Sequence, residues 1–153
     1  MTVRELQTSN VKSVSPDTDL AVVAKLMWEG DCGAVPVVTD DRKVIGMITD
    51  RDICIASATR SKPPAEIRAS EVISANGVHA VKPDDDVRIA LRAMRKHRVR
   101  RLPVVDREQR LTGIVSINDL AINASPSLPD SVPAQEFLET FQAICAHEKH
   151  AVA

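Results

Sequence analysis

Two hydroxyl–acid pairs with the same spacing, Thr49 with Asp52 and Ser116 with Asp119, each follow a short apolar stretch that contains a glycine. The first turn of a helix exposes unpaired N–H groups and a partial positive charge, so a Ser or Thr at its start adds one more donor for a phosphate. A carboxylate three residues later lies on the same helix face and accepts two hydrogen bonds, which suits the vicinal diol of a ribose. The two pairs therefore predict binding sites for a ribose phosphate.

The same spacing also has a purely structural interpretation. In a capping box, the carboxylate accepts a hydrogen bond from the backbone N–H of the residue that caps its own helix, and no ligand is involved. One isolated Ser/Thr-x-x-Asp pair would favour this alternative, whereas two pairs at equivalent places favour ligand binding. The residues alone leave both interpretations open.

The two pairs lie in an internal repeat. A shift of 67 residues aligns Val11–Ile53 with Val78–Leu120 without a gap. The residues of the first copy that recur in the second are Val11, Val14, Pro16, Asp17, Asp19, Met27, Pro36, Val37, Val38, Gly46 and Asp52. Chance at average residue usage would match about one position in 15 to 20, so the pattern indicates a duplication.

Hydrophobic periodicity predicts the order strand, helix, strand, strand, helix in each copy. Pro36 and Pro103 lack an N–H, so each should begin a strand or face a sheet edge. The elements expected in the first copy are a strand Val11–Val14, a helix opened by Pro16-Asp17 and ended by Gly30, strands Val35–Val38 and Val44–Ile48, and a helix from Thr49. The apolar face expected on the first of these helices is Leu20, Val23, Ala24 and Met27.

The second copy repeats these elements after a Pro-containing connector, Ser57–Ala65, and a short helical stretch, Glu66–Ile73. The elements expected are a helix from Asp84 with Val87, Ala90, Leu91 and Met94 buried, strands Leu102–Val105 and Leu111–Val115, and a helix from Ser116. A unit of about 60 residues buries so little surface that its folded state is only marginally stable alone. We therefore expect an α/β (α+β) pair with pseudo-twofold packing and two equivalent clefts, divided as residues 1–60, 61–123 and 124–153.

Residues 124–153 should form a Pro/Ser linker and an amphipathic helix, Ala134–Glu148. The apolar stripe of this helix is Phe137, Leu138, Phe141, Ile144 and Cys145. A helix with such a stripe either folds back on its own globule or packs across a dimer. Trp28, the only tryptophan, is expected to pack at a helix end.

The composition fits an ordinary globular protein. Hydrophobic residues make up 44% of the 153 residues and charged residues 27%, which excludes a disordered or fibrous chain. The net charge of -1 gives no overall attraction to nucleic acid or to an anionic membrane. No apolar run approaches the roughly 20 residues of a membrane span, and Met1–Glu5 has no signal core. We therefore expect a cytoplasmic protein.

The strand-turn-helix signature, written PVV…D…G-apolar-apolar-[T/S]-x-x-D and present twice, resembles the cystathionine-beta-synthase (CBS) domain family over about residues 1–123. The FQAIC ending of the last predicted helix, Phe141–Cys145, resembles the tail of free-standing bacterial members of that family. The resemblance implies a regulatory module that binds AMP, ADP, ATP, NAD or S-adenosylmethionine in the clefts between its repeats. It implies that Asp52 and Asp119 bind ribose and that Thr49 and Ser116 lie near phosphate. It also implies that adenine lies beside Ser9–Val11 and Asn76–Val78.

The phosphate side differs between the copies. Nucleotide-binding members of the family commonly carry an arginine two or three residues before the proline of the PVV strand. Arg100 and Arg101 occupy these positions in the second copy, whereas Gly33 and Ala34 occupy them in the first. We therefore predict a tighter site at Ser116 and Asp119, with Arg51 as a partial substitute in the first copy.

Several other functions are weighed against nucleotide sensing. No nucleophile with a base and no pair of acids in an apolar cleft predicts an enzyme. Arg88, Arg92, Arg95, Lys96, Arg98, Arg100 and Arg101 form a basic run, but no aromatic residue accompanies it for base stacking, so nucleic acid is not expected.

The alternatives that stay open are a ligand-free oligomerisation module and a redox or metal sensor. The sensor would use Cys32, Cys54 or the group Cys145, His147 and His150, although no metal site is predicted. His79 and His97 have no evident partner. We expect a homodimer that signals to an unknown effector protein in trans, without an obligatory cofactor.

Overall fold

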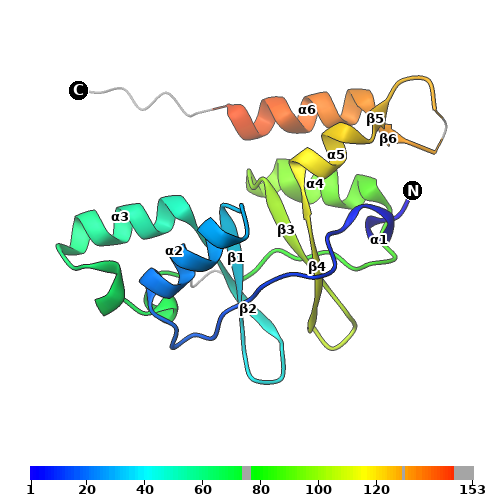
Figure 1. Cartoon of the computed structure of the whole chain (residues 1–153). Helices are drawn as coiled ribbons and strands as arrows, with labels where there is room; N and C mark the ends of the chain where they lie inside the picture. The colour runs from blue at the N-terminus through cyan, green and yellow to red at the C-terminus, as the bar shows by residue number, and fades with distance from the viewer. Residues whose placement is uncertain (74–76, 129, 147–153) are drawn as a thin grey trace, which may run out of the picture. The chain divides into compact units, whose positions relative to one another are not determined.

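The computed structural model describes residues 1–73, 77–128 and 130–146. The chain forms two compact units (Figure 1). The repeat-1 unit contains Asn10–Val78 together with Asp106–Leu111. The repeat-2 unit contains Met1–Ser9, His79–Val105 and the chain from Thr112 on. Each unit therefore combines segments that are distant in the sequence.

The repeat-1 unit begins with α2, Leu20–Glu29, whose buried residues are Leu20, Val23 and Met27. The helix starts later than Pro16-Asp17, so that prediction was wrong. Asp19 is the N-cap because its carboxylate accepts a hydrogen bond from the Val22 N–H at 2.9 Å. Residues 15–18 form a turn before it, closed by the Thr18 N–H on the Ser15 carbonyl. Gly30 ends the helix as predicted.

Strands β1, Ala34–Val38, and β2, Val44–Thr49, follow as an antiparallel pair. All five residues of β1 are buried, as expected for a strand covered on both faces. The predicted strand Val11–Val14 is reduced to one bridge between Val14 and Val37. Pro36 lies inside β1, and its carbonyl accepts from the Val14 N–H at 3.0 Å. The missing proline N–H on this side limits pairing with the Val14 segment.

Helix α3, Asp50–Arg60, starts after Thr49 as predicted. It continues through Ser57–Arg60, which were expected to belong to the connector. Two 3-10 turns, η1 (Pro64–Glu66) and η2 (Ala69–Glu71), replace the single helical stretch expected over Glu66–Ile73. Prolines at 63 and 64 favour such short turns because their fixed backbone angle suits a helix start but not a helix interior.

The repeat-2 unit has the equivalent core. Helix α4, Val87–His97, buries Val87, Ala90, Leu91 and Met94 as predicted, and Asp86 rather than Asp84 caps it. Strands β3, Arg101–Val105, and β4, Leu111–Ser116, form a two-stranded sheet that precedes α5, Ile117–Ile122. The remaining elements are α1 (Val3–Leu6), β5 (Ala124–Ser125), β6 (Val132–Pro133) and α6 (Ala134–Cys145).

The segment that precedes each copy packs on the other copy. In the repeat-2 unit, the Val3 N–H donates to the Asp85 carbonyl at 2.9 Å, and the Arg4 N–H donates to the Pro83 carbonyl at 2.8 Å. The repeat-1 unit has the matching bonds. The Ala69 N–H donates to the Thr18 carbonyl at 2.8 Å, and the Ser70 N–H donates to the Pro16 carbonyl at 2.9 Å. The duplication therefore extends to residues before Val11, where sequence identity is too low to reveal it.

Helix α6 packs along α4 (Figure 1). Ile144 belongs to the repeat-2 core, and Thr140 is 2% exposed and donates its hydroxyl to the Glu136 carbonyl at 2.8 Å. Two ion pairs border the contact, Arg88 with Glu136 at 2.9 Å and Arg95 with Glu139 at 2.8 Å. The fold-back alternative for this helix is confirmed, while Leu138, Phe141 and Cys145 of the predicted stripe are exposed.

Candidate functional site

Thr49 and Asp52 form a reciprocal capping box at the start of α3. The backbone N–H and the hydroxyl of Thr49 both donate to Asp52 Oδ2, at 2.8 and 2.7 Å. The Asp52 N–H donates back to Thr49 Oγ1 at 3.2 Å. The structural interpretation of the Ser/Thr-x-x-Asp spacing is therefore realised in this copy.

Ser116 and Asp119 form the same box at the start of α5. The Ser116 N–H and hydroxyl donate to Asp119 Oδ2 at 2.7 and 2.6 Å, and the Asp119 N–H donates to Ser116 Oγ at 3.3 Å. Both boxes use only one carboxylate oxygen. Within residues 1–73, 77–128 and 130–146, Oδ1 of Asp52 and Asp119 accepts no hydrogen bond, so capping leaves one oxygen of each acid for a ligand.

The two predicted arginines are held next to the second box by the backbone. The Ile117 N–H, the first of α5, donates to the Arg100 carbonyl at 2.8 Å. This bond fixes the junction between the loop that ends at Arg100 and strand β3, which begins at Arg101, beside the helix start that follows Ser116. Arg100 is exposed and Arg101 is half-buried. Neither guanidinium has an acidic partner in the part of the chain that the structure describes, so both positive charges are available to a phosphate.

The first copy has the same backbone and different side chains. The Asp50 N–H donates to the Gly33 carbonyl at 3.3 Å, which is the equivalent of the bond from Ile117 to Arg100. Ala34 pairs with Thr49 across the sheet and offers no charge. The Arg51 side chain is exposed, and the backbone N–H of Arg51 donates to Asp50 Oδ1 at 2.7 Å. The arginine prediction for this copy therefore depends on Arg51 alone.

The glycines before the two boxes allow close backbone contact with the preceding segments. A Cβ at Gly46 would lie 2.4 Å from Ile73 Cγ2. A Cβ at Gly113 would lie 2.9 Å from the Thr8 carbonyl oxygen and 3.1 Å from Gln7 Oε1. Gln7 Oε1 is buried and has no hydrogen-bond partner among the residues that the structure describes. Each box therefore lies at the end of a strand whose glycine is covered by residues from before a repeat.

The residues proposed to contact adenine are only partly placed. Val78 is half-buried, and Ser9 and Asn10 are exposed. Asn76 lies outside the described residues. His79, which follows Val78, stacks on His97 with ring centroids 3.3 Å apart and an angle of 13° between the planes. Burial, and then the nearby His79 and Lys96, lower the pKa of His97. The expectation that these histidines lack a partner was wrong.

The described residues contain no group of three or more His, Cys, Asp or Glu side chains arranged for a metal. Cys32, Cys54 and Cys145 are free and exposed. His147 and His150, which would complete the predicted alternative with Cys145, lie outside the described residues. No helix in those same parts of the chain has the length and apolar character that crossing a membrane requires.

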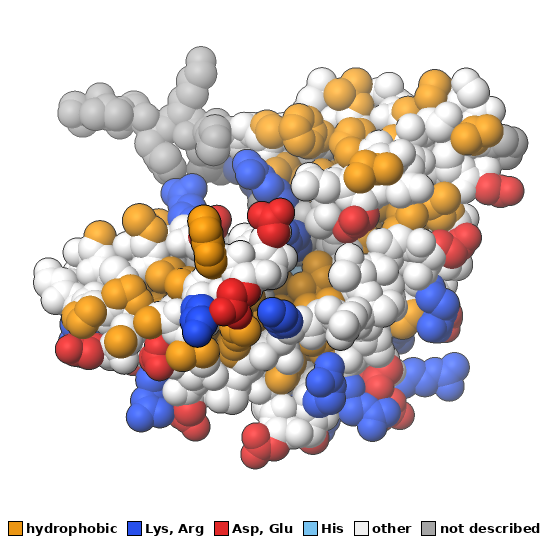
Figure 2. Space-filling view, in the orientation of Figure 1, with side chains coloured by type: hydrophobic (Ala, Val, Ile, Leu, Met, Phe, Trp, Pro, Cys, Tyr) orange, Lys and Arg blue, Asp and Glu red, His pale blue; other side chains and the backbone are white. Residues whose placement is uncertain are grey.

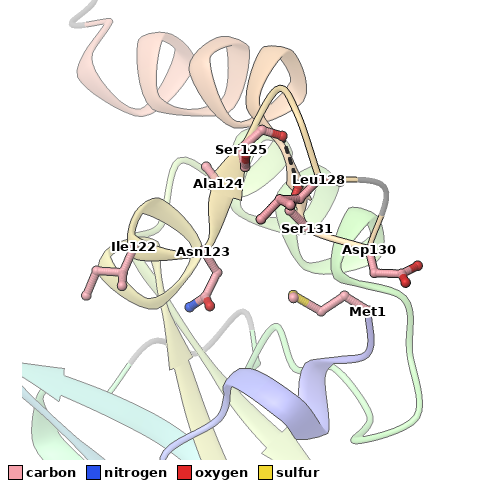
Figure 3. A pocket seen from close by; sticks show the side chains of 8 residues that line it. All are labelled: Met1, Ile122, Asn123, Ala124, Ser125, Leu128, Asp130 and Ser131. Atoms are coloured by element: carbon pink, nitrogen blue, oxygen red, sulfur yellow. Dashed lines mark hydrogen bonds between the residues drawn. The ribbon is translucent and has the colours of Figure 1, made fainter.

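A separate pocket lies in the repeat-2 unit between the N-terminus and the segment after α5 (Figure 3). Its lining residues are Met1, Ile122, Asn123, Ala124, Ser125, Leu128, Asp130 and Ser131. None of the predicted site residues belongs to it. The side chains of Ile122 and Leu128 are 83% and 65% exposed, so the pocket is an open surface depression rather than an enclosed cavity.

Comparison with known families identifies both copies. The model of the CBS domain matches residues 3–59 and 69–125. The CBS domain-containing protein YhcV of Bacillus subtilis is 35% identical over 125 residues, which cover 79% of this chain and 84% of YhcV. Hypoxic response protein 1 of Mycobacterium tuberculosis is 32% identical over 145 residues, which cover 95% of this chain and 94% of that protein.

Solved structures agree with this assignment. The crystal structure of Hypoxic Response Protein I with two coordinated zinc ions has 34% sequence identity and a TM-score of 0.74, and the match covers 82% of this chain and all of that one. The CBS domain protein TA0289 of Thermoplasma acidophilum has 25% identity and a TM-score of 0.77, over 94% of this chain and 75% of that one. The predicted α/β fold of paired repeats is thus confirmed.

Two structures of lower identity contain ligands. The CBS domain protein PAE2072 of Pyrobaculum aerophilum, complexed with AMP, matches with 24% identity and a TM-score of 0.71, over 78% of this chain and 90% of that one. The CBS domain pair of MJ0100, in complex with 5-methylthioadenosine and S-adenosyl-L-methionine, matches with 24% identity and a TM-score of 0.72, over 80% of this chain and 94% of that one. At this identity the likeness establishes the fold.

Proposed function

Because the chain belongs to the CBS-domain family, we propose that it is a regulatory protein that binds an adenine nucleotide, AMP, ADP, ATP or NAD, through the residues around its two capping boxes. The observation that carries the proposal is the bond from the Ile117 N–H to the Arg100 carbonyl. It holds two arginines beside a helix start whose acid is Asp119. Among the described residues, neither arginine has an acidic partner and one oxygen of Asp119 accepts no hydrogen bond. The AMP in PAE2072 and the adenosyl ligands of MJ0100 support the choice of an adenine nucleotide.

The two sites should differ in affinity. In the second copy, Ser116 and Asp119 bind the ribose phosphate together with Arg100 and Arg101. In the first copy, Thr49 and Asp52 do so with Arg51 alone. A hydrogen bond to a charged group contributes about 1.5 to 3 kcal/mol, which is up to about a hundredfold in affinity. The second site is therefore the tighter one, and Asn76 and Val78 are the proposed neighbours of adenine.

The proposal includes no catalytic step. The match to inosine-5'-monophosphate dehydrogenase of Methanocaldococcus jannaschii covers only 22% of that enzyme, so the resemblance does not extend to the rest of it. We propose a cytoplasmic homodimer, with divisions at residues 1–60, 61–123 and 124–153, whose output is read by another protein. Free, exposed cysteines suit a reducing compartment.

The capping boxes support a second candidate, a ligand-free structural or oligomerisation module. In that case Asp52 and Asp119 act only within their helices. A zinc- or thiol-responsive protein is a third candidate, which the two zinc ions of the Hypoxic Response Protein I crystal support. These candidates differ in what stabilises the folded chain.

A thermal-shift panel separates the three candidates. A ligand at 100 times its dissociation constant stabilises the folded state by about 2.7 kcal/mol. The panel contains AMP, ADP, ATP, NAD, S-adenosylmethionine and zinc chloride, each with wild type, Asp119→Ala and Asp52→Ala. We expect a rise in melting temperature with one adenine nucleotide that Asp119→Ala removes and Asp52→Ala reduces less. No shift with any nucleotide would support the structural module, and a shift with zinc alone would support the metal sensor.

A further inference from the structure

Two exposed apolar side chains of helix α2, Ala21 and Trp28, lie on one stripe that has no cover within the described residues. Trp28, the only tryptophan of the chain, is 87% exposed, so the expectation that it packs at a helix end was wrong. The buried face of α2 is formed by Leu20, Val23 and Met27, and Trp28 follows Met27 just outside that face. Ala21, seven residues or about two turns earlier on the same stripe, is also exposed.

The duplication indicates what kind of element covers such a stripe. At the shift of 67 residues, Ala21 corresponds to Arg88 and Trp28 to Arg95. Both arginines lie on α4 and pair with Glu136 and Glu139 of α6. In the second copy this stripe is therefore a packing surface for a helix. The positive charges of its arginines pair with the acidic edge of α6.

In the first copy, the residues that correspond to the two arginines of this packing surface are apolar. An acidic helix edge would find no arginine at Ala21 and Trp28, so an uncharged helix face fits these two positions better. The remaining charges of α2 near this stripe, Lys25 and Glu29, lie 3.8 Å apart as a pair on the same helix. The packing surface on α2 thus fits an apolar helix face and does not fit the acidic edge of α6.

The outer face of α6 has the required character. The only charged residues of the helix are Glu136 and Glu139, and both are paired with α4. The exposed residues on its outer face are Gln135, Leu138, Phe141, Gln142 and Cys145. Leu138 and Phe141 are 46% and 45% exposed, and the Phe141 ring is oriented by stacking on Phe137. Hydrophobic side chains reach the surface over this helix (Figure 2).

We propose that α2 of one chain packs against the outer face of α6 of a second copy, with Trp28 in contact with Leu138 and Phe141. In a twofold dimer the contact occurs twice, because each chain supplies one α2 and one α6. Tryptophan is among the residues that carry most of the binding energy in such interfaces. The inference rests on the proposed homodimer and assigns its surface.

The sole tryptophan reports directly on the proposed contact. We expect the emission of the full-length wild type to shift to longer wavelength on dilution, in step with dissociation measured by analytical ultracentrifugation. Trp28→Ala and Leu138→Ser should each raise the dimer dissociation constant at least about tenfold, with Phe141→Ser as a second variant on the same face. Leu138→Ser and Phe141→Ser should also expose Trp28 at concentrations where the wild type is dimeric.

The matched controls are Leu128→Ser and Ile122→Ser, which remove exposed apolar side chains of the same unit outside α6. Both should leave the dissociation constant unchanged, and circular dichroism establishes that every variant is folded. A mixture of Trp28→Ala with Phe141→Ser provides a test specific to a reciprocal contact. Its heterodimer keeps one intact contact, so the mixture should dimerise better than either variant alone.

Three results would overturn the proposal at different levels. A wild type that is monomeric at all concentrations removes the homodimer as well. A dimer that persists in Trp28→Ala and Phe141→Ser leaves the homodimer standing and removes this surface. A buried tryptophan whose emission does not depend on concentration would indicate a contact within one chain.

Discussion

Ser116 and Asp119 are joined through a single carboxylate oxygen, Oδ2, which accepts both the N–H and the hydroxyl of Ser116, at 2.7 and 2.6 Å. The other oxygen, Oδ1, is left to a ligand. Capping therefore occupies only one of the two oxygens, and the structural and functional interpretations of the motif do not exclude each other. The first prediction separates them.

Asp119 should recognise the ribose diol. We expect isothermal titration calorimetry to give weaker binding of 2'-deoxy-AMP than of AMP to the wild type, and similar binding of the two to Asp119→Ala. Ser116→Ala removes the cap and should lower the free energy of unfolding by about 1 kcal/mol, while wild-type discrimination between AMP and 2'-deoxy-AMP persists. Equal discrimination in Asp119→Ala and wild type would remove the proposed role.

Arg100 and Arg101 should bind phosphate and not the nucleoside. Arg100→Ala and Arg101→Ala are each expected to weaken AMP binding by about ten- to a hundredfold, as loss of a charged hydrogen bond predicts. Binding of adenosine, which has no phosphate, should not change. Arg107→Ala, which alters an exposed arginine in the turn after β3, is the matched control. A loss of adenosine binding would point to a structural effect instead.

A side chain at Gly46 or at Gly113 should lower the free energy of unfolding. Gly46→Ala places a Cβ 2.4 Å from Ile73 Cγ2, and Gly113→Ala places one 2.9 Å from the Thr8 carbonyl oxygen. Overpacking of this kind typically costs about 1 to 3 kcal/mol, which urea denaturation will measure. Ile73→Ala should partly rescue Gly46→Ala, because it removes the nearest atom.

Gly113→Ala has no equivalent rescue, since a backbone oxygen, that of Thr8, is one of the two nearest atoms and no substitution removes it. The control is Gly77→Ala, where no atom of the described residues beyond the chain neighbours lies within 4 Å and the positive φ of 80° opposes a side chain. Stabilities of Gly46→Ala and Gly113→Ala equal to wild type would show that the preceding segments do not pack as described.

The stack of His79 on His97 should make stability depend on pH. Because burial lowers the pKa of folded His97 below its ordinary 6.5, the unfolded chain binds the proton first as pH falls. The stabilising contribution is therefore complete above about pH 6.5 and is lost as pH falls from there through the folded pKa. His97→Gln should reduce the slope of stability against pH between pH 7.5 and 5.5. An unchanged slope would exclude His97 as its source.

Most of the local structure could be predicted from the sequence because its causes are local. The repeat, the buried faces of α2 and α4, the paired strands and the helix starts at Thr49 and Ser116 all follow from periodicity, turn residues and capping chemistry. The helix starts at Leu20 and Val87 were misplaced because the aspartates at 17 and 19, and likewise at 84 and 86, are equally good caps in isolation. Only the turns that precede them decide which one is used.

The sequence by itself determined that two copies exist, that each carries a hydroxyl and an acid at a helix start, and that only the second carries arginines shortly before the proline of its PVV strand. The tertiary structure alone decided which oxygen of each acid is occupied, that each preceding segment packs on the opposite copy, and that α6 covers α4 while Trp28 of α2 stays exposed. These features depend on contacts between residues far apart in the chain, and neither spacing nor composition encodes such contacts.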